Sequence, residues 1–352
     1  MFILRKFIPL FINLQLFALN DGGTNVTNHE PIDTGDLSPE MKTYYDMTLL
    51  DEAGPQLVHQ QFGQKRPIPK NGGKTIEFRK FSKLPKATTP LVEGVTPQGG
   101  TLDVTAITAT VAQYGYFIVQ SDVLELTAID NTIVEATKLL GQQAGLTLDT
   151  IVRNVLMTGT NVSYASKVAD DGTITPVASR KGLDKTAKLT VREVKKQVTN
   201  LRAVNAPKIN GDYVCIIHPY QAFDLMNDKE WIDAHQYASP EEIYNGEIGK
   251  IGGCRFVEST EAKIYKDETC PTDLSVFIAL FLGQNAYGVT EITGGGLQTI
   301  VKQKGSAGTA DPLDQRSSVG WKALKTAELL IPNYLVRVES CSKRFSATTQ
   351  AN

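Results

Sequence analysis

The sequence predicts an α+β protein because it combines one long amphipathic helix, a long β-hairpin ahead of that helix, and a second half rich in strands. The chain has 352 residues, of which 41% are hydrophobic and 21% are charged. This is enough length for two or three domain-sized units and enough apolar side chain for a substantial core. The net charge of −2 gives no global basic field that would indicate nucleic acid as the main partner.

The first 50 residues are predicted to form an extended arm followed by a helix. Residues 20–38 are polar and rich in Gly, Pro and Asp, which is typical of a weakly ordered arm. A helix is expected to begin at Ser38 as its N-cap, with Pro39 in the first turn. Before the arm, Arg5 and Lys6 precede an apolar run that mimics a secretory signal. Polar residues and a proline break this run, and it is too short to span a bilayer.

Residues 64–120 are predicted to form an extended β-hairpin. Ile76 and Phe78 alternate with charged neighbours, as in a half-buried strand, and a second β-rich stretch follows a loop rich in Pro and Gly. A hairpin of this length has little core of its own. We therefore expect it to pack on another part of the protein or on another chain.

Residues 122–158 carry the clearest helical pattern. Apolar side chains recur every three or four positions from Ile129 to Val155, a span of about 40 Å in a helix. Gly141 and Gly145 lie on one face of this helix. They either allow another backbone to approach closely or are simply tolerated, although each glycine costs about 1 kcal/mol of helix stability relative to alanine.

The stretch "GDYVCIIHPYQAFDLM", residues 211–226, brings Cys215, His218 and Asp224 close together in the sequence. The three could be a nucleophile, a base and an orienting group, or they could hold a metal. In a regular strand, however, alternation places Cys215 and His218 on opposite faces. Pro219 fits the first turn of a following helix. A strand-to-helix joint, with the histidine satisfying the junction, is the favoured interpretation.

No other motif indicates catalysis, a metal or a cofactor. The chain has no phosphate loop of the GxxxxGK[ST] kind, no GxGxxG, no HExxH and no GxSxG. The four histidines are widely separated, and the four cysteines form no CxxC pair, which argues against a zinc site or a disulfide scaffold. We expect no catalytic residues, no bound metal and no cofactor.

Charge is strongly segregated along the chain. Residues 21–52 carry a net charge of −7 and residues 65–86 a net charge of +7, while residues 180–202 carry +6 and residues 224–247 carry −6. These stretches are either solvated faces or complementary patches that bring identical subunits together. The basic stretches have few interleaved aromatics, so single-stranded nucleic acid is weakly supported as a ligand.

Five stretches together carry a family resemblance. They are "NLQLFA", "PLVEGVTPQGG", "GDYVCIIHPYQAFDLMND", "YNGEIGKIGGCRFVES" and "DPLDQRSSVGWKALKTAELL". In this order, over roughly residues 12–340, the sequence resembles the major capsid protein family of tailed phages typified by coliphage N-four. The chain departs from the family at its start, where Ile12 takes the place of the usual initiating Met and eleven residues precede it.

The resemblance implies the Hong Kong 97 capsid fold and a division of the chain into named parts. These are an N-arm at 1–50, an E-loop hairpin at 64–120, a P-domain at 121–204 and 321–352 with its spine helix at about 122–158, and an A-domain at 205–320. The E-loop is expected to reach over a neighbouring subunit.

The resemblance also implies a function without enzymatic activity. The expected protein is a major capsid protein of the virion, assembled in the host cytoplasm into hexamers and pentamers of an icosahedral shell around the genome. Expected partners are further copies of the chain, separate scaffolding, portal or decoration proteins, and packaged DNA through non-specific proximity, with no membrane. Two alternatives remain open: an encapsulin-like nanocompartment shell protein, or a hydrolase that uses Cys215 and His218.

The intersubunit contacts are expected on the acidic arm and on the basic hairpin. The candidate residues are Asp33, Asp36, Glu40, Lys74, Arg79, Lys80, Lys83, Lys86, Glu93, Gly94 and Gln98.

Overall fold

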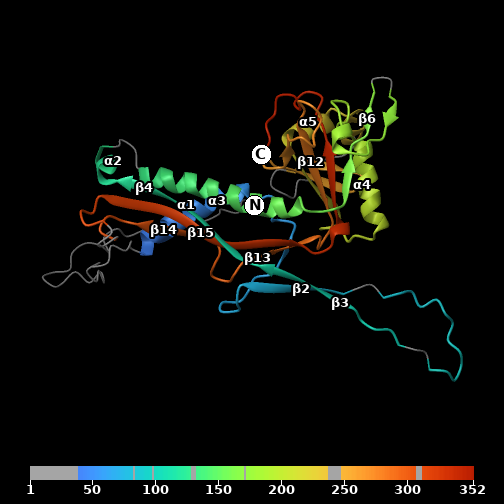
Figure 1. The fold of residues 1–352 in the computed structure, drawn as a ribbon, viewed down its shortest axis with the longest axis horizontal. Helices are drawn as coiled ribbons and strands as arrows, with labels where there is room; N and C mark the ends of the chain where they lie inside the picture. Colours follow the sequence, from blue (N-terminus) through green and yellow to red (C-terminus); the bar gives the residue numbers. More distant parts are fainter. Residues whose placement is uncertain are drawn as a thin grey trace, which may run out of the picture.

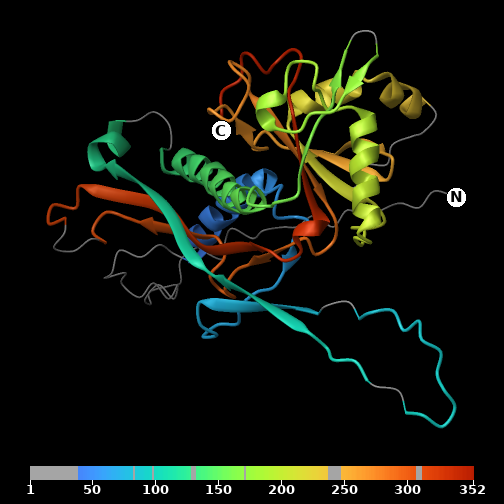
Figure 2. The same cartoon turned by 45° about the vertical axis from the view of Figure 1, so that its right-hand side comes forward.

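A computed structural model describes residues 39–81, 84–96, 99–127, 132–169, 172–236, 247–306 and 311–352. The molecule has two lobes and a long hairpin that projects away from both (Figures 1 and 2). One lobe is an elongated sheet covered by two helices, and the other is a wider sheet flanked by shorter helices. Among the described residues, no helix is long and apolar enough to cross a membrane.

The first lobe packs two helices on one face of a sheet that is antiparallel except for its edge strand β1, which pairs parallel with β13. The helices are α1 (Pro39–Ala53) and α3 (Thr132–Leu156), and α1 ends in a short 3-10 turn at Gly54–Gln56. The sheet contains β1 (Gln64–Lys65), β4 (Ala112–Ser121), β13 (Tyr287–Thr290), β14 (Gln298–Lys302) and β15 (Arg316–Leu329). The long strand β15 holds the sheet together, because β4, β13 and β14 all pair with it. Leu49, Leu140 and Trp321 form the core between helices and sheet.

The long helix is shorter than the predicted 122–158. The structure has a separate short helix α2 (Asp122–Thr127) before α3, and residues 128–131 lie outside the described part. The end of β4 is tied to the start of α3, because Gln120 donates to the carbonyl of Thr132 at 3.1 Å and accepts from its hydroxyl at 3.2 Å. These bonds fix the beginning of α3 ten residues after the predicted position.

The second lobe is built on a seven-stranded mixed sheet. Its strands are β5 (Val162–Tyr164), β16 (Leu335–Ser340), β12 (Val276–Leu282), β8 (Tyr213–Ile217), β10 (Cys254–Glu258) and β9 (Glu247–Ile251), in that order, with β11 (Ile264–Tyr265) paired to β12. The flanking helices are α4 (Val191–Ala203), α5 (Pro219–Met226) and α6 (Lys229–Gln236). A small ribbon of β6 (Lys167–Val168) and β7 (Ile174–Thr175) and 3-10 turns at Arg180–Gly182 and Pro332–Tyr334 complete the lobe.

Strand β8 shows why this sheet is apolar on both faces. Tyr213, Cys215 and Ile217 face one core cluster, and Val214 and Ile216 face another. A strand buried on both faces has apolar residues at consecutive positions rather than at alternate ones, as β8 does.

The lobes differ in two respects from the predicted division at residue 320. The sequence predicts that β16 belongs with the long helix, but β16 pairs with β12 and β5 inside the seven-stranded sheet. It also predicts that β13 and β14 belong to the A-domain, but both strands pair with β15 beside α3. The chain therefore passes between the lobes three times, after α3, before β13 and before β16, one time more than in the predicted division.

A hairpin is confirmed within the predicted range 64–120, but it is shorter, because β1 and β4 at the two ends of that range pair with β13 and β15. Strands β2 (Thr75–Phe81) and β3 (Val104–Thr110) pair antiparallel from Thr75 opposite Thr110 to Phe81 opposite Val104. At its root, Phe78 and Ala109 are buried against Leu330. Beyond the paired strands, a long loop extends away from the body (Figure 2).

Candidate functional site

The Cys215–His218 stretch is a strand-to-helix connection, as the sequence interpretation predicted. Cys215 is completely buried beside Cys254, and burial raises the pKa of its thiol well above the ordinary value. Such a thiol is protonated and inert. His218 is the N-cap of α5: its Nδ1 accepts from the N–H of Tyr220 at 3.2 Å, and Gln221 completes a capping box. Burial lowers the pKa of His218 to about 4, so the ring is neutral at pH 7.

The glycine pair of α3 marks a close approach of two helices. A Cβ placed on Gly141 would lie 2.8 Å from the carbonyl oxygen of Leu49, and one on Gly145 would lie 2.6 Å from that of Ala53. The contact confirms the first of the two interpretations, in which α1 packs backbone to backbone against α3. It also shows that α1 and α3 run in the same direction.

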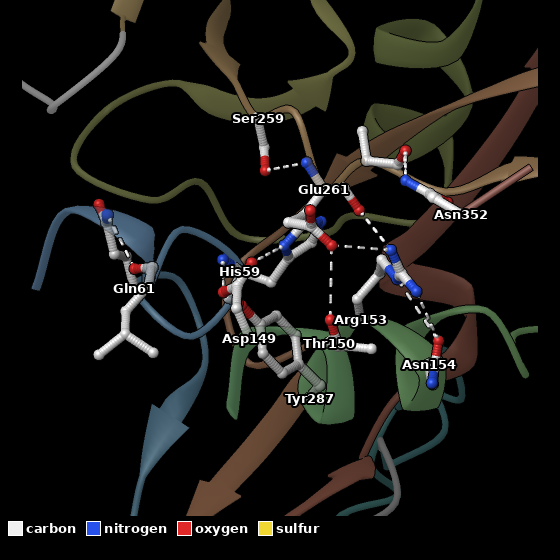
Figure 3. Close-up of polar contacts among 12 residues, drawn as sticks. His59, Gln61, Asp149, Thr150, Arg153, Asn154, Ser259, Glu261, Tyr287 and Asn352 are labelled. Atoms are coloured by element: carbon white, nitrogen blue, oxygen red, sulfur yellow. Dashed lines mark hydrogen bonds and ion pairs between the residues drawn. The ribbon is translucent and has the colours of Figure 1, made fainter. Parts of the chain in front are cut away.

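A buried polar cluster lies where α3 meets the second lobe, and we call it the joint (Figure 3). Its members are His59, Asp149, Arg153, Glu261 and Tyr287. His59 and Asp149 are both completely buried; the ring Nδ1 lies 2.6 Å from one carboxylate oxygen, and the backbone N–H of His59 donates to the other at 2.7 Å. The Tyr287 hydroxyl donates to the carbonyl of His59. The segment after α1 is therefore held to α3 and to β13 at one point.

Arg153, one turn further along α3, reaches the second lobe. It donates to the backbone carbonyl of Glu261 at 2.8 Å and lies 3.4 Å from the carboxylate of the same residue. Burial lowers the pKa of the Arg153 guanidinium, while Glu261 raises it. An arginine remains charged under any such shift, so this side chain is a fixed cationic link between α3 and the loop after β10.

The joint orients the lobes and offers no access for a reaction. A histidine hydrogen-bonded to a carboxylate has the form of a general base with its orienting group. Here both side chains are fully buried, so a substrate cannot reach them. Sequence reasoning missed the pair because the two residues lie 90 positions apart. One signal was present: Asp149 interrupts the apolar stripe of the predicted helix, between Leu148 and Val152.

The predicted contact residues that the structure describes lie mainly on the hairpin. Lys74, Arg79, Lys80, Lys86, Glu93 and Gly94 are all exposed, whereas Asp33, Asp36, Lys83 and Gln98 lie outside the described residues. Glu40 falls in the first turn of α1. Arg79 lies 3.6 Å from Glu77 of the same strand. The structure thus places the basic candidates on one projecting element.

The basic stretch 180–202 and the acidic stretch 224–247 contact each other within one chain. Lys195 of α4 lies 2.5 Å from Glu230 of α6, and Asp228 accepts from the N–H of Val191 at 3.0 Å. These contacts join the basic and the acidic stretch beside each other in the second lobe. Among the described residues, no ion pair joins residues 44–52 to the basic stretch 65–86, so within one chain these two stretches do not neutralise each other.

A family model described as phage capsid protein matches residues 121–305. This range covers more than half of the chain and runs from α2 to the end of β14, across both lobes. The chain belongs to the phage capsid protein family.

Solved capsid structures share the fold. The capsid of Ralstonia phage GP4 is 16% identical with a TM-score of 0.61, covering 82% of this chain and 89% of that one. The capsid of cyanophage P-SCSP1u is 14% identical with a TM-score of 0.61, covering 81% and 88%, and that of cyanophage Pam1 is 14% identical with a TM-score of 0.58, covering 83% and 92%. No curated protein sequence matches the chain.

Family and fold together confirm the predicted class. The protein is a phage major capsid protein with a Hong Kong 97-like fold, and it forms the shell of the virion as one of many subunits. The matches favour neither the nanocompartment nor the hydrolase alternative. Within the described residues, no group of three His, Cys, Asp or Glu side chains is placed to hold a metal ion.

Proposed function

We propose that the hairpin is the main element through which one subunit contacts its neighbours in hexamers and pentamers of the shell. The observation that carries this proposal is the exposure of its tip. Five large apolar side chains between β2 and β3 are 61–79% exposed: Leu84, Leu91, Val92, Val95 and Leu102. Contiguous exposed apolar surface marks interaction sites, and this loop has no core of its own within one chain.

The parts of the fold take the roles of a capsid subunit. We assign the arm before α1 to an N-arm, the 64–120 hairpin to an E-loop, and α3 with the β4, β15 and β14 strands to a P-domain. The seven-stranded sheet, including β16, becomes the A-domain. Sheet pairing supports this assignment, since strands that share hydrogen bonds and a core move together.

The acidic stretch 21–52 and the basic stretch 65–86 form complementary contacts between subunits. Glu93, Gly94 and Gln98 contribute to the same contact from the tip of the hairpin. Individually, such exposed ion pairs contribute less than about 1 kcal/mol. Repeated around a ring, they steer subunits into one register.

A charge-reversal experiment tests this contact. Reversal of Lys80, Lys83 and Lys86 to glutamate is expected to impair shell assembly, as counted by electron microscopy of the purified protein. Reversal of Asp33, Asp36 and Glu40 to lysine on the same chain is expected to restore it in part. Reversal of Lys181, Lys185 and Arg192, three exposed cations of the second lobe, is the control with the same change in charge. Normal assembly of the hairpin variant at low and high salt would contradict the proposal.

The shell protein acts without catalysis and through non-specific partners. We propose assembly in the host cytoplasm, with a separate scaffolding protein if one is needed, and with portal or decoration proteins as further partners. Packaged DNA lies against the shell without sequence recognition. The sealed His59–Asp149 pair and the inert Cys215 support the absence of catalysis. Activity-based thiol and serine probes should leave the native protein unlabelled.

A further inference from the structure

A hollow of about 330 Å³ opens at the root of the hairpin, between β2, β1 and the end of β15. We call it the root groove. Part of its wall is apolar and part is cationic. Phe78, Phe81 and Ile331 form the apolar part, and Arg66, Arg79 and Lys80 form the cationic part. Phe81 is 58% exposed. A ligand that fits this wall carries negative charge and apolar side chains together.

The cations of the root groove are available for a ligand. Within the described part of the chain, the side chains of Arg66 and Lys80 have no acidic partner, and Arg79 has only its strand neighbour Glu77 at 3.6 Å. On the other side of β1, Lys65 lines a second hollow of about 240 Å³, in which the buried Lys325 is paired with Glu291 at 3.5 Å. Among the described residues, the unpaired cations at the edge of β1 are therefore Lys65 and Arg66, and Arg66 lines both hollows.

One segment of the chain has the matching composition. Residues 30–37, "EPIDTGDL", contain Glu30, Asp33 and Asp36 but no basic residue, and they carry Ile32 and Leu37 between the acids. We propose that the root groove binds residues 30–37 of a second copy of the chain. The acids pair with Arg66, Arg79 and Lys80, and the apolar side chains cover Phe81.

The path of α1 favours a second copy over the same chain. Asp46 accepts from the N–H of Thr299 on β14 at 3.3 Å, so the first half of α1 lies beside β14. From there α1 advances along α3, past Gly141 and Gly145, toward the root groove. The 15 residues of α1 cover about 22 Å. Asp36 lies three residues before Pro39, a chain length of about 10 Å at full extension, which is less than half the length of α1.

This inference rests on the proposed assembly, because it needs a neighbouring subunit. It is tested by pairing two cysteines in the full-length protein, Asp36→Cys with Phe81→Cys, followed by mild copper-phenanthroline oxidation under assembly conditions. The four native cysteines are all buried and contribute little background. We expect disulfide-linked dimers and larger multimers on a denaturing gel, which a reductant converts to monomers.

The matched control is Asp36→Cys with Lys70→Cys, because Lys70 is exposed in the same basic stretch but does not line the groove. An intrachain disulfide would overturn the assignment to a second copy. Absence of crosslinks, or equal crosslinking in the control, would overturn the root groove as the binding site. Shells seen by electron microscopy in the wild-type sample report on the proposed assembly separately.

A binding measurement removes the dependence on assembly. A labelled peptide of residues 28–38 is titrated with unassembled full-length protein and followed by fluorescence anisotropy. Arg66→Glu with Lys80→Glu should weaken binding at least tenfold, and so should Ile32→Ser with Leu37→Ser in the peptide. Lys181→Glu with Lys185→Glu makes the same change in charge on the second lobe, where both lysines are exposed and away from the groove, and should have little effect. Equal weakening by both protein variants would show a diffuse charge effect and overturn the groove.

Discussion

The joint and the hairpin use charged residues in opposite ways. In the joint, His59, Asp149 and Arg153 are buried and hold segments of one chain that lie 90 or more positions apart. In the hairpin, Arg79, Lys80 and Lys86 are exposed on an element with little packing of its own. The first region sets the shape of the subunit, and the second is left for contacts outside it.

The energetic reasons differ as well. Removing one partner of a buried, hydrogen-bonded pair costs several kcal/mol, because the other polar group is left buried without its partner. Exposed charges cost little, and each contributes little, so recognition through them needs many charges on a repeated interface. The comparison predicts that substitutions in the joint act on folding, whereas substitutions in the hairpin act on assembly.

The largest effect is expected from Asp149→Ala. The substitution leaves the His59 N–H and ring without their acceptors in a fully buried place, so the free energy of unfolding should fall by about 3–5 kcal/mol. Urea unfolding followed by circular dichroism measures this. Glu135→Ala on the same helix removes an exposed ion pair with Lys138 and should change stability by less than about 1 kcal/mol. Similar losses in both variants would contradict the distinction.

A smaller loss is expected from Gly145→Ala. By helix propensity alone, alanine should stabilise α3 by about 1 kcal/mol. The added methyl would lie 2.6 Å from the carbonyl of Ala53, so α1 must move, and we expect a net loss of about 1–3 kcal/mol. A rise in melting temperature would show that the two helices separate freely.

Sequence patterns predicted the parts of the fold that depend on local periodicity. The hairpin and the amphipathic stripe of α3 follow from side-chain spacing, and the His218 cap follows from Pro219 and the alternation in β8. The spacing of Gly141 and Gly145 shows that both lie on one face of α3, but it does not show which element packs on that face, so two interpretations remained open. The start of α3 was misplaced because side-chain bonds between Gln120 and Thr132 fix it.

The remaining features depend on contacts between distant segments. No local pattern connects His59 with Asp149, and none places β16 beside β12 instead of beside β15. Likewise, the basic character of residues 180–202 was visible, but its pairing with Glu230 needed the packing of α4 on α6. The sequence therefore predicts which residues are charged, and the tertiary structure decides which of these charges are already paired.

His218 gives a pH-dependent prediction of intermediate size. Burial lowers its pKa to about 4, against about 6.5 in an unfolded chain. Between these values the unfolded state binds a proton that the folded state does not, so this group makes stability fall as the pH drops from 6.5 to 4. His218→Asn keeps an N-cap acceptor and removes the titration. The variant should lose less stability than the wild type over this range, by about 2 kcal/mol.

Buried carboxyl groups provide the internal check on that experiment. Burial raises the pKa of Asp224 and Glu258, and a raised carboxyl pKa favours the folded state as the pH falls. Both groups are present in wild type and variant, so they cancel in the difference between the two unfolding curves. A difference that does not change between pH 6.5 and 4 would show that His218 titrates normally.

The smallest effect on folding, and the clearest on assembly, is expected at the tip of the hairpin. Leu91 and Val92 are 79% and 68% exposed, so replacing both by serine should change the free energy of unfolding by less than about 0.5 kcal/mol per site. Under the proposed subunit contact these side chains become buried against a neighbouring subunit, so each lost contact is repeated at every copy. The variant should unfold like the wild type while forming far fewer shells by sedimentation and electron microscopy. Unchanged shell yield would place the tip outside the subunit contacts and leave the charged stretches as the only candidates on the hairpin.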